Sequence, residues 1–464
     1  MASPASPVTS AAAPGLKSLL NLAWPVIISR ASQVVVGLSD ALMIAHLGED
    51  ALAATTTGAM NAFTLFIFPM GVVFIVASYS SQLHGKGDAA GAARYGTYGL
   101  VVALLAQVVA LASLPWLRPG LGLFSYTPEV RMLITEYLHI RLLSAGMAVG
   151  IEALSNYYGG LGNTRFPMRI SLLAMALNVL GNWLLIDGRL GLPAMGVRGA
   201  ALASTLATLV ACTVMVWCFV RDAGKHGEWR SRLRWRELAR MMRFGVPSGL
   251  NWLLDFLAFS FFINVVVAGM GTTALAALMA VFQINAFSFM PAFAVASAGA
   301  ILAGQAIGAQ AKDHVPSIVR LTLKVTMTWQ GLVGLLYFLL PGPLFAPFVS
   351  DGHDDGSLRA LGTGLLMLSA TWQLFDAVAT TMSEILRSAG DTAFTLWARV
   401  VLSWAVFVPG TYLTTRYLGW REHGMVVWLC TYLALLAATL VIRFLRGAWR
   451  RIDITVLDDD AATS

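Results

Sequence analysis

The sequence predicts an all-α polytopic membrane protein, and three observations carry that prediction: composition, apolar runs and an internal repeat. The chain has 464 residues, of which 57% are hydrophobic and only 12% are charged. A soluble domain carries about 25% charged residues, so the composition excludes an ordinary soluble protein. Twelve apolar runs of membrane-spanning length follow one another along the chain.

The twelve predicted transmembrane helices leave only short tails and connections between them. They lie at 19–45, 54–82, 96–117, 133–160, 168–187, 197–220, 244–270, 274–303, 317–340, 360–387, 394–416 and 424–446. We expect a disordered N-terminal tail at 1–15, an N-terminal six-helix bundle at 16–220, a cytoplasmic amphipathic connector at 221–243, a C-terminal six-helix bundle at 244–446 and a cytoplasmic C-terminal tail at 447–464.

An internal repeat indicates that the two bundles are pseudo-symmetric copies of one another. GEDALAA at 48–54 recurs as GTTALAA at 271–277, and Pro25 and Pro69 recur as Pro247 and Pro291, all at a nearly constant offset. Because six helices are an even number, both copies have the same orientation in the membrane, which makes a parallel repeat. Transporters of this architecture bind substrate near the midplane between the bundles, so the repeat favours a secondary transporter with alternating access.

The distribution of Lys and Arg predicts the orientation of the chain. With the N-terminus in the cytoplasm, the inner loops and tails hold 22 of these residues and the outer loops hold 7. Both termini are therefore expected in the cytoplasm. The basic segment Arg221–Arg243 is interpreted as a connector on the anionic inner leaflet, the alternative being a site for a partner or nucleic acid.

Several function classes find no support in the sequence. The three cysteines lie in apolar runs without a CxxC motif and are interpreted as small core residues. The seven histidines are scattered without HExxH, and GxxxxGK[ST] is missing, which argues against a membrane metalloenzyme and an ATP motor. We expect neither enzyme activity nor a cofactor, and no nucleic-acid partner.

Five stretches carry a resemblance to a known family. They are WPVIISRASQVVVGLSDALMIAHLG, GLGNTRFPM, LNVLGNWLLIDG, GVPSGLNWLLD and WQLFDAVATTMSEILRSAGDT. Over residues 16–446 the chain resembles the MATE (multidrug and toxic compound extrusion) transporters, in the NorM-like branch. The resemblance implies a V-shaped pair of bundles in the cell inner membrane that exports organic cations, driven by inward H⁺ or Na⁺. We expect a functional monomer.

The resemblance also implies which residues act. Its functional acids correspond to Asp40, Asp255 and Asp376, and its span-5 asparagines to Asn178 and Asn182. NorM-like proteins commonly have Glu in span 7, so Asp255 is a shorter variant that keeps the charge. A Tyr often found near the span-10 acid is Trp372 in this chain, which departs from the family pattern.

The positions of two acids also indicate an ion site without the resemblance. Asp255 lies 12 residues past Arg243, and Asp376 lies 11 residues before Arg387. Both are therefore expected about 17 Å into a hydrocarbon core of about 30 Å. Two carboxylates at one depth in one bundle suit Na⁺ or a bound proton; the alternative is that each is satisfied separately by hydroxyls or water.

The first bundle contains a second candidate. Asp40 lies in the outer half of span 1, where it either couples ion binding to transport or is a carboxylate at the external mouth. Asn178 and Asn182 are one helical turn apart and share a face. They line the cavity beside Asp40 or, alternatively, make interhelical hydrogen bonds.

Other polar and aromatic residues of the spans are candidates for lining the cavity. Gln283 and Asn285 in span 8 either help span 7 to hold the ion or pair with a neighbouring helix. Trp252 and Trp372 lie close to the acids in sequence, where they suit flat organic cations through cation–π contacts or are ordinary membrane core.

Arg30 and Glu152 are predicted to form a structural ion pair. Both lie near the middle of their spans in the same bundle, about 13 residues from a basic inner flank.

The leading hypothesis is an ion-coupled multidrug exporter. The alternative within transport is a flippase for a lipid-linked precursor or polysaccharide, which would need a basic cavity where the predicted groups are mainly acidic. A membrane-embedded enzyme and a receptor or scaffold have less support.

Overall fold

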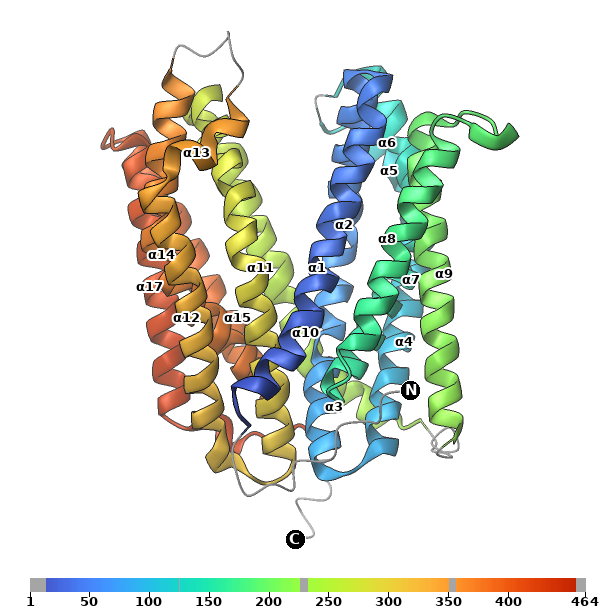
Figure 1. The fold of residues 1–464 in the computed structure, drawn as a ribbon, viewed down its shortest axis with the longest axis vertical. Coiled ribbons are helices and arrows are strands. Elements are labelled where there is room, and N and C mark those ends of the chain that lie inside the picture. Colours follow the sequence, from blue (N-terminus) through green and yellow to red (C-terminus); the bar gives the residue numbers. More distant parts are fainter. Residues whose placement is uncertain (1–13, 125, 226–232, 350–355, 456–464) are drawn as a thin grey trace. The chain divides into compact units, whose positions relative to one another are not determined.

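The computed structural model describes residues 14–124, 126–225, 233–349 and 356–455 (Figure 1). In these ranges the chain is helical and has no β-strand, which confirms the all-α class. The helices of the first half are α1 (Leu16–Ile44), α2 (Glu49–Val73), α3 (Ile75–Lys86), α4 (Ala89–Ser113), α5 (Leu117–Leu121), α6 (Pro128–Arg141), α7 (Ala145–Gly160), α8 (Arg165–Leu185) and α9 (Gly196–Lys225). Those of the second half are α10 (Trp235–Phe261), α11 (Thr272–Gly308), α12 (Val315–Leu339), α13 (Pro341–Phe345), α14 (Ser357–Ser388), α15 (Thr392–Val401), α16 (Val408–Arg416) and α17 (Arg421–Leu445).

The long helical segments match the predicted spans in number and order. Within the described ranges, ten segments are long and apolar enough to cross a membrane, and an eleventh consists of Lys312–Leu339 and Pro341–Phe348, which meet at a bend of 93°. The twelfth is α14, which has 32 residues and is less apolar because it contains Asp376, Glu384 and Arg387.

Helix starts follow from local chemistry where the chain turns. Asp88 precedes α4 and accepts a hydrogen bond from the backbone N–H of Gly91 at 2.7 Å. Thr127 precedes α6 and accepts one from Val130, with Pro128 in the first helical position. Such side chains satisfy backbone donors that a helix leaves free at its N-terminus.

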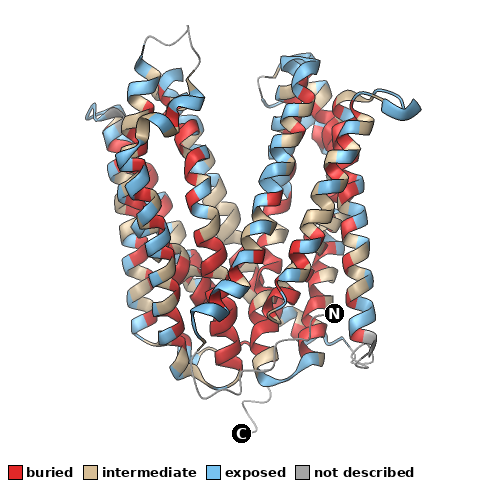
Figure 2. Cartoon of the chain, viewed as in Figure 1, coloured by how far each residue is buried: buried red, intermediate tan, exposed pale blue. Residues whose placement is uncertain are grey.

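Many exposed side chains are large and apolar. Leu104, Val109 and Leu339 are 65%, 68% and 61% exposed. Leaving such side chains in water forgoes about 1.5–3 kcal/mol each, a cost that hydrocarbon surroundings remove. Figure 2 shows that buried and exposed positions alternate around the same helices, so one side of a helix packs within its group and the other faces outward. This pattern fits a protein surrounded by lipid.

The chain divides into two compact units. Among the described residues, Pro25–Gly249 form unit 1, and the remainder, which includes Leu16–Trp24, forms unit 2. α1 and α10 therefore each contribute to both units, so the unit boundaries differ from the predicted bundle boundaries at 16 and 244. Unit 2 has one large apolar core, which includes Leu19 and Ala23 from the start of α1.

The backbone repeats where the sequence repeats. Gly48 has φ 107° and ψ 171°, and Gly271, which opens the matching motif of the second copy, has φ 111° and ψ 167°. Only glycine adopts this conformation readily, which explains why both copies keep it before the apolar helix that follows. Gly87 and Gln310, which are separated by the same offset, both have positive φ, at 77° and 61°.

Two predicted segments lie partly outside the described residues. The connector at 221–243 is not one separate element: α9 extends to Lys225, 226–232 lie outside the described residues, and α10 runs from Trp235 into span 7 without a break. The predicted tail at 447–464 is packed where it is described, because Trp449 and Ile454 are buried. The predicted tail residues 1–13 and 456–464 also lie outside the described residues.

Two helices of unit 2 widen into π-helical turns. α10 continues as Phe262–Val267 and α15 as Leu402–Phe407, and both stretches are π-helical. The rings of Phe262 and Phe407 pack with centroids 5.0 Å apart. π-Turns inside α-helices are rare and frequently occur at functional sites.

Candidate functional site

In unit 1, a polar cluster surrounds Asp40 of α1. Asn182 donates from Nδ2 to Asp40 Oδ1 at 2.5 Å, and Ser204 of α9 donates to Asp40 Oδ2 at 3.5 Å. Asn178 donates to Ser204 Oγ at 2.9 Å. The structure thus brings together Asp40, Asn178 and Asn182 as the sequence predicts, because the two asparagines lie one turn apart on α8.

The Asp40 cluster is buried and incompletely satisfied. Asp40 is 9% exposed and Asn182 is fully buried. Asn182 Oδ1 has no hydrogen-bond partner, although its Nδ2 bonds both Asp40 and Asn178. A buried acceptor without a donor costs about 1–3 kcal/mol. The cluster therefore presents a carboxylate and an amide oxygen that a cation or a proton donor can satisfy.

Two members of this cluster are absent from the predicted site. Ser204 is one of them, and a serine in an apolar helix carries no distinctive signal in the sequence. Arg141 of α6 interacts electrostatically with Asp40, and it donates to Ser144 Oγ at 3.0 Å. Its signal is its position inside predicted span 4, where a charge needs a partner.

In unit 2, Asp376 of α14 has a similar arrangement. Gln330 of α12 donates from Nε2 to Asp376 Oδ2 at 3.0 Å, and Thr380 donates to Oδ1 at 3.4 Å. Gln330 is fully buried, and its Oε1 has no hydrogen-bond partner. Asp376 therefore lies beside an unsatisfied amide oxygen, as Asp40 does. Gln330 was not among the predicted site residues, although an amide inside an apolar span is a usable signal.

Asp255 of α10 is held by a cation. Arg399 of α15 donates from Nη1 to Asp255 Oδ2 at 3.1 Å and from Nη2 to Ser383 Oγ at 3.4 Å. The Asp255 side chain is 44% exposed and that of Arg399 is 20% exposed. Both charges act electrostatically on Asp376. The predicted pair of free carboxylates is thus a three-charge group.

The placement of Arg399 corrects the charge assignment made from the sequence. The 22 Lys and Arg residues of the predicted inner loops and tails include Arg399, but this residue is the eighth of α15 and lies within the apolar segment Thr392–Arg416. Its position inside predicted span 11 was the available signal, because an intramembrane Arg requires a carboxylate partner.

The predicted cavity-lining residues of unit 2 separate into buried and exposed positions. Asn285 is buried and accepts a hydrogen bond from Gln373 of α14, while Gln283 is exposed. Trp372 is only 6% exposed and belongs to the apolar core. Trp252 is partly buried and packs edge-to-face on Phe293 with centroids 6.3 Å apart.

Arg30 and Glu152 meet in unit 1. Arg30 Nη2 donates to Glu152 Oε1 at 3.1 Å, and the side chains are 23% and 12% exposed. Asn156 adds a hydrogen bond to the same carboxylate oxygen at 3.3 Å. The carboxylate of Glu152 therefore neutralises the charge of Arg30.

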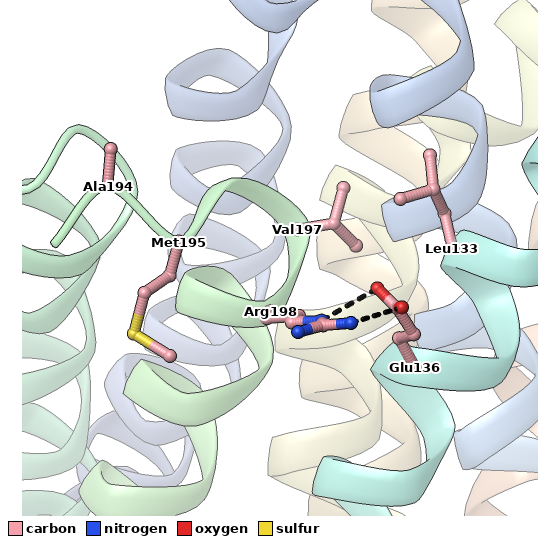
Figure 3. A pocket seen from close by; sticks show the side chains of 6 residues that line it. All are labelled: Leu133, Glu136, Ala194, Met195, Val197 and Arg198. Atoms are coloured by element: carbon pink, nitrogen blue, oxygen red, sulfur yellow. Dashed lines mark hydrogen bonds and ion pairs between the residues drawn. The ribbon is translucent and has the colours of Figure 1, made fainter.

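A small cavity of about 320 Å³ in unit 1 contains a further ion pair (Figure 3). Its lining residues are Leu133, Glu136, Ala194, Met195, Val197 and Arg198. Arg198 binds both oxygens of Glu136, from Nε at 2.8 Å and from Nη2. Both charges are therefore satisfied within the cavity, and none of the predicted site residues lines it.

The described residues contain no cluster of side chains typical of a site for a divalent metal ion. Within the described residues, no group of three or more His, Cys, Asp or Glu side chains could hold a metal ion. A monovalent cation at Asp376 would instead have one carboxylate, the Gln330 amide oxygen and the Thr380 hydroxyl as oxygen ligands.

Known proteins resemble this chain over nearly its whole length. "Probable multidrug resistance protein NorM" of Pseudomonas putida is 29% identical over 435 residues, which cover 92% of this chain and 93% of that protein. The protein of the same name from Thermotoga maritima is 25% identical over 445 residues, which cover 94% of this chain and 93% of that protein. Both are named multidrug resistance proteins, and neither name is that of an enzyme.

Solved structures show the same fold. The outward-facing conformation of a multidrug resistance MATE family transporter of the MOP superfamily matches with a TM-score of 0.83 and 19% identity, covering 94% of this chain and 97% of that chain. A MATE structure in the bent conformation matches with a TM-score of 0.82 and 20% identity, covering 96% and 97%. The MatE family model matches residues 25–184 and 247–413, one segment in each copy of the repeat. The chain therefore belongs to the MatE family.

Proposed function

We propose that the protein is a secondary active multidrug exporter, which antiports organic, mainly cationic, compounds against inward H⁺ or Na⁺ by alternating access. Family membership and the names of the relatives support the multidrug part of this proposal. The sequence has no phosphate-binding motif for ATP, so an ion gradient is the energy source that remains. No cofactor takes part beyond the coupling ion.

One observation carries the coupling part: each unit has an intramembrane carboxylate beside a buried amide oxygen without a partner. These are Asp40 with Asn182 and Asp376 with Gln330. An ionised carboxylate inside a membrane is costly, so binding a cation lowers the free energy of the site. A proton or Na⁺ neutralises the charge, and Na⁺ also gains the amide oxygen as a ligand. We assign the ion-coupling role to Asp40, Asp255 and Asp376, and Asp255 contributes through its charge, because its carboxylate already accepts from Arg399.

The exchange cycle follows from competition for these charges. With the site open to the outside, the acids take up H⁺ or Na⁺ and the bound organic cation leaves. Neutralisation favours the inward-open state, where the ion leaves and the acids again attract a cationic compound. Coupling arises because ion and compound favour different charge states of the same carboxylates. We assign contacts with the compound to Trp252, Asn178, Asn182, Gln283 and Asn285, with Trp372 supporting them from the core.

The membrane placement is part of the proposal. The excess of Lys and Arg in the predicted inner loops supports a multi-pass protein of the cell inner membrane with both termini in the cytoplasm. Each chain contains both units, which supports a functional monomer.

Ethidium movement in liposomes tests this function. The purified full-length protein is reconstituted, a Na⁺ gradient or a pH gradient is imposed in separate experiments, and ethidium fluorescence is followed over time. We expect at least one gradient to drive ethidium against its concentration difference, and the driving ion identifies the coupling cation. Ethidium that only equilibrates under both gradients would overturn the antiporter proposal.

A further inference from the structure

The Asp255–Arg399 pair lies beside the proposed ion site of unit 2 without completing it. Arg399 contacts Asp255 and Ser383, whereas Asp376 is contacted by the neutral side chains of Gln330 and Thr380. The three charges nevertheless influence one another electrostatically. The pair therefore changes the total charge of the group that a coupling ion meets.

The position of Arg399 makes its charge significant. The residue lies about 10 Å along a membrane-length helix from its start at Thr392, and most of its side chain is shielded from solvent. An unpaired Arg inside a membrane segment is costly, and the ion pair with Asp255 removes that cost for Arg399. Tyr432 of α17 also interacts with both members of the pair, and as a phenol it adds no charge near neutral pH.

We propose that Arg399 is a built-in counter-cation, which sets the number of coupling ions that unit 2 accepts. The two acids contribute two negative charges and Arg399 one positive charge, so the group carries one net negative charge. Because Arg399 occupies Asp255, that charge resides on Asp376. Unit 2 consequently takes one monovalent cation per cycle, bound at Asp376. The proposal rests on the ion-coupled function stated above.

A second observation places the cation at Asp376 and not at Asp255. The fully buried Gln330 side chain bonds Asp376 through Nε2 and leaves Oε1 without a partner. Asp255 is instead 44% exposed and already accepts from a guanidinium group. The oxygen ligands available to a small cation therefore lie at Asp376, whereas the guanidinium group of Arg399 neutralises Asp255.

Counting the cations displaced by ethidium tests the proposal. The full-length protein is purified in detergent with Asp40→Asn present in every variant, so that only the unit 2 acids respond. Ethidium binding is measured by fluorescence polarisation at rising Na⁺ and, separately, at falling pH. By linkage, the slope of log apparent Kd against log cation concentration approaches the number of cations displaced.

The variants separate a counter-cation from a merely structural pair. We expect a slope of about one in the Asp40→Asn parent and about two after Arg399→Gln, since both acids then need a cation. The added substitution Asp255→Asn should return the slope to about one. Arg399→Lys, which keeps the charge, serves as the matched control with the parent slope. If Arg399→Gln does not fold, Asp255→Asn alone should abolish the cation dependence, because Arg399 then neutralises Asp376.

Two outcomes overturn the proposal in distinguishable ways. A parent that responds to a cation, together with an unchanged slope in Arg399→Gln or in Asp255→Asn, shows that the pair is structural only. A parent whose ethidium binding responds to neither cation shows that the underlying exchange at unit 2 fails.

Discussion

Asn182 of α8 and Asp40 of α1 are joined by a 2.5 Å hydrogen bond, and the other polar atom of the Asn182 amide has no partner. Removing a donor from a buried charged acceptor costs about 1.5–3 kcal/mol. We therefore expect Asn182→Ala to lower the thermal stability of the detergent-purified protein and to slow gradient-driven ethidium transport.

The matched control for Asn182 is Asn264→Ala. Asn264 is exposed, and its amide donates only to the carbonyl of Ser260 in its own helix. Thermal unfolding followed by intrinsic tryptophan fluorescence compares the two variants. Equal losses of stability in the two variants would show that the hydrogen bond to Asp40 does not contribute specifically to the stability of the folded protein.

The Arg30–Glu152 pair predicts a rescue by charge reversal. Breaking a fully buried ion pair costs about 3–5 kcal/mol, and the 23% exposure of Arg30 reduces this to about 1–3 kcal/mol. We expect Arg30→Glu and Glu152→Arg each to destabilise the protein and the double variant to recover most of the loss. Thermal unfolding and the yield of monodisperse protein measure the recovery.

The more exposed pair of Glu136 and Arg198 provides the comparison. The Arg198 side chain is 58% exposed, and water and salt screen an exposed pair so that it contributes little to stability. Glu136→Gln should therefore cost less than Glu152→Gln. A double reversal at Arg30 and Glu152 that restores neither folding nor transport would refute a structural role for that pair.

Two glycines on α14 test how tightly unit 2 packs. A methyl group at Gly362 would collide with the ring of the fully buried Phe345, whereas one at Gly364 would meet nothing within 4 Å. Gly362→Ala should destabilise by about 1–3 kcal/mol through overpacking. Gly364→Ala should be neutral or stabilise by up to about 1 kcal/mol, because Ala favours the helix. Chemical denaturation in mild detergent measures both changes, and equal effects would contradict the packing of Phe345 on α14.

Sequence alone predicts depth along a helix well and lateral neighbours poorly. The Asp40 cluster was predictable because Asn178 and Asn182 are spaced by one helical turn and share a face. Arg30 and Glu152 were predictable because two opposite charges at one depth in one bundle each need a partner. The first inference uses the period of the helix, and the second uses its rise per residue.

Asp255 shows where that reasoning ends. Its depth matches that of Asp376, but depth does not reveal that α15 brings Arg399 to within 3.1 Å. The count of Lys and Arg in the predicted inner loops also includes Arg399, although the residue lies inside an apolar segment. The sequence does not mark Gln330 as a site residue for a different reason. A single amide in an apolar helix is compatible with ordinary hydrogen bonding between helices.

The repeat offers a stronger sequence signal than any single motif. A nearly constant offset relates the predicted copies, and the backbone conformations of Gly48 and Gly271, which correspond under that offset, agree within a few degrees. The acids do not follow the repeat, since the residue of the first copy that corresponds to Asp255 is Gln33. The two units therefore share a fold while their charged residues differ.

The most direct test of the coupling account is ethidium transport by Asp376→Asn in liposomes under the gradient that drives the unmodified protein. Asp313→Asn is the control, because Asp313 is an exposed acid that pairs with Arg450 at the very start of the segment Lys312–Leu339. We predict that Asp376→Asn still inserts into liposomes as folded protein but no longer moves ethidium against its concentration difference, while Asp313→Asn retains coupled transport. Unchanged coupled transport by folded Asp376→Asn would contradict the assignment of the coupling cation to Asp376.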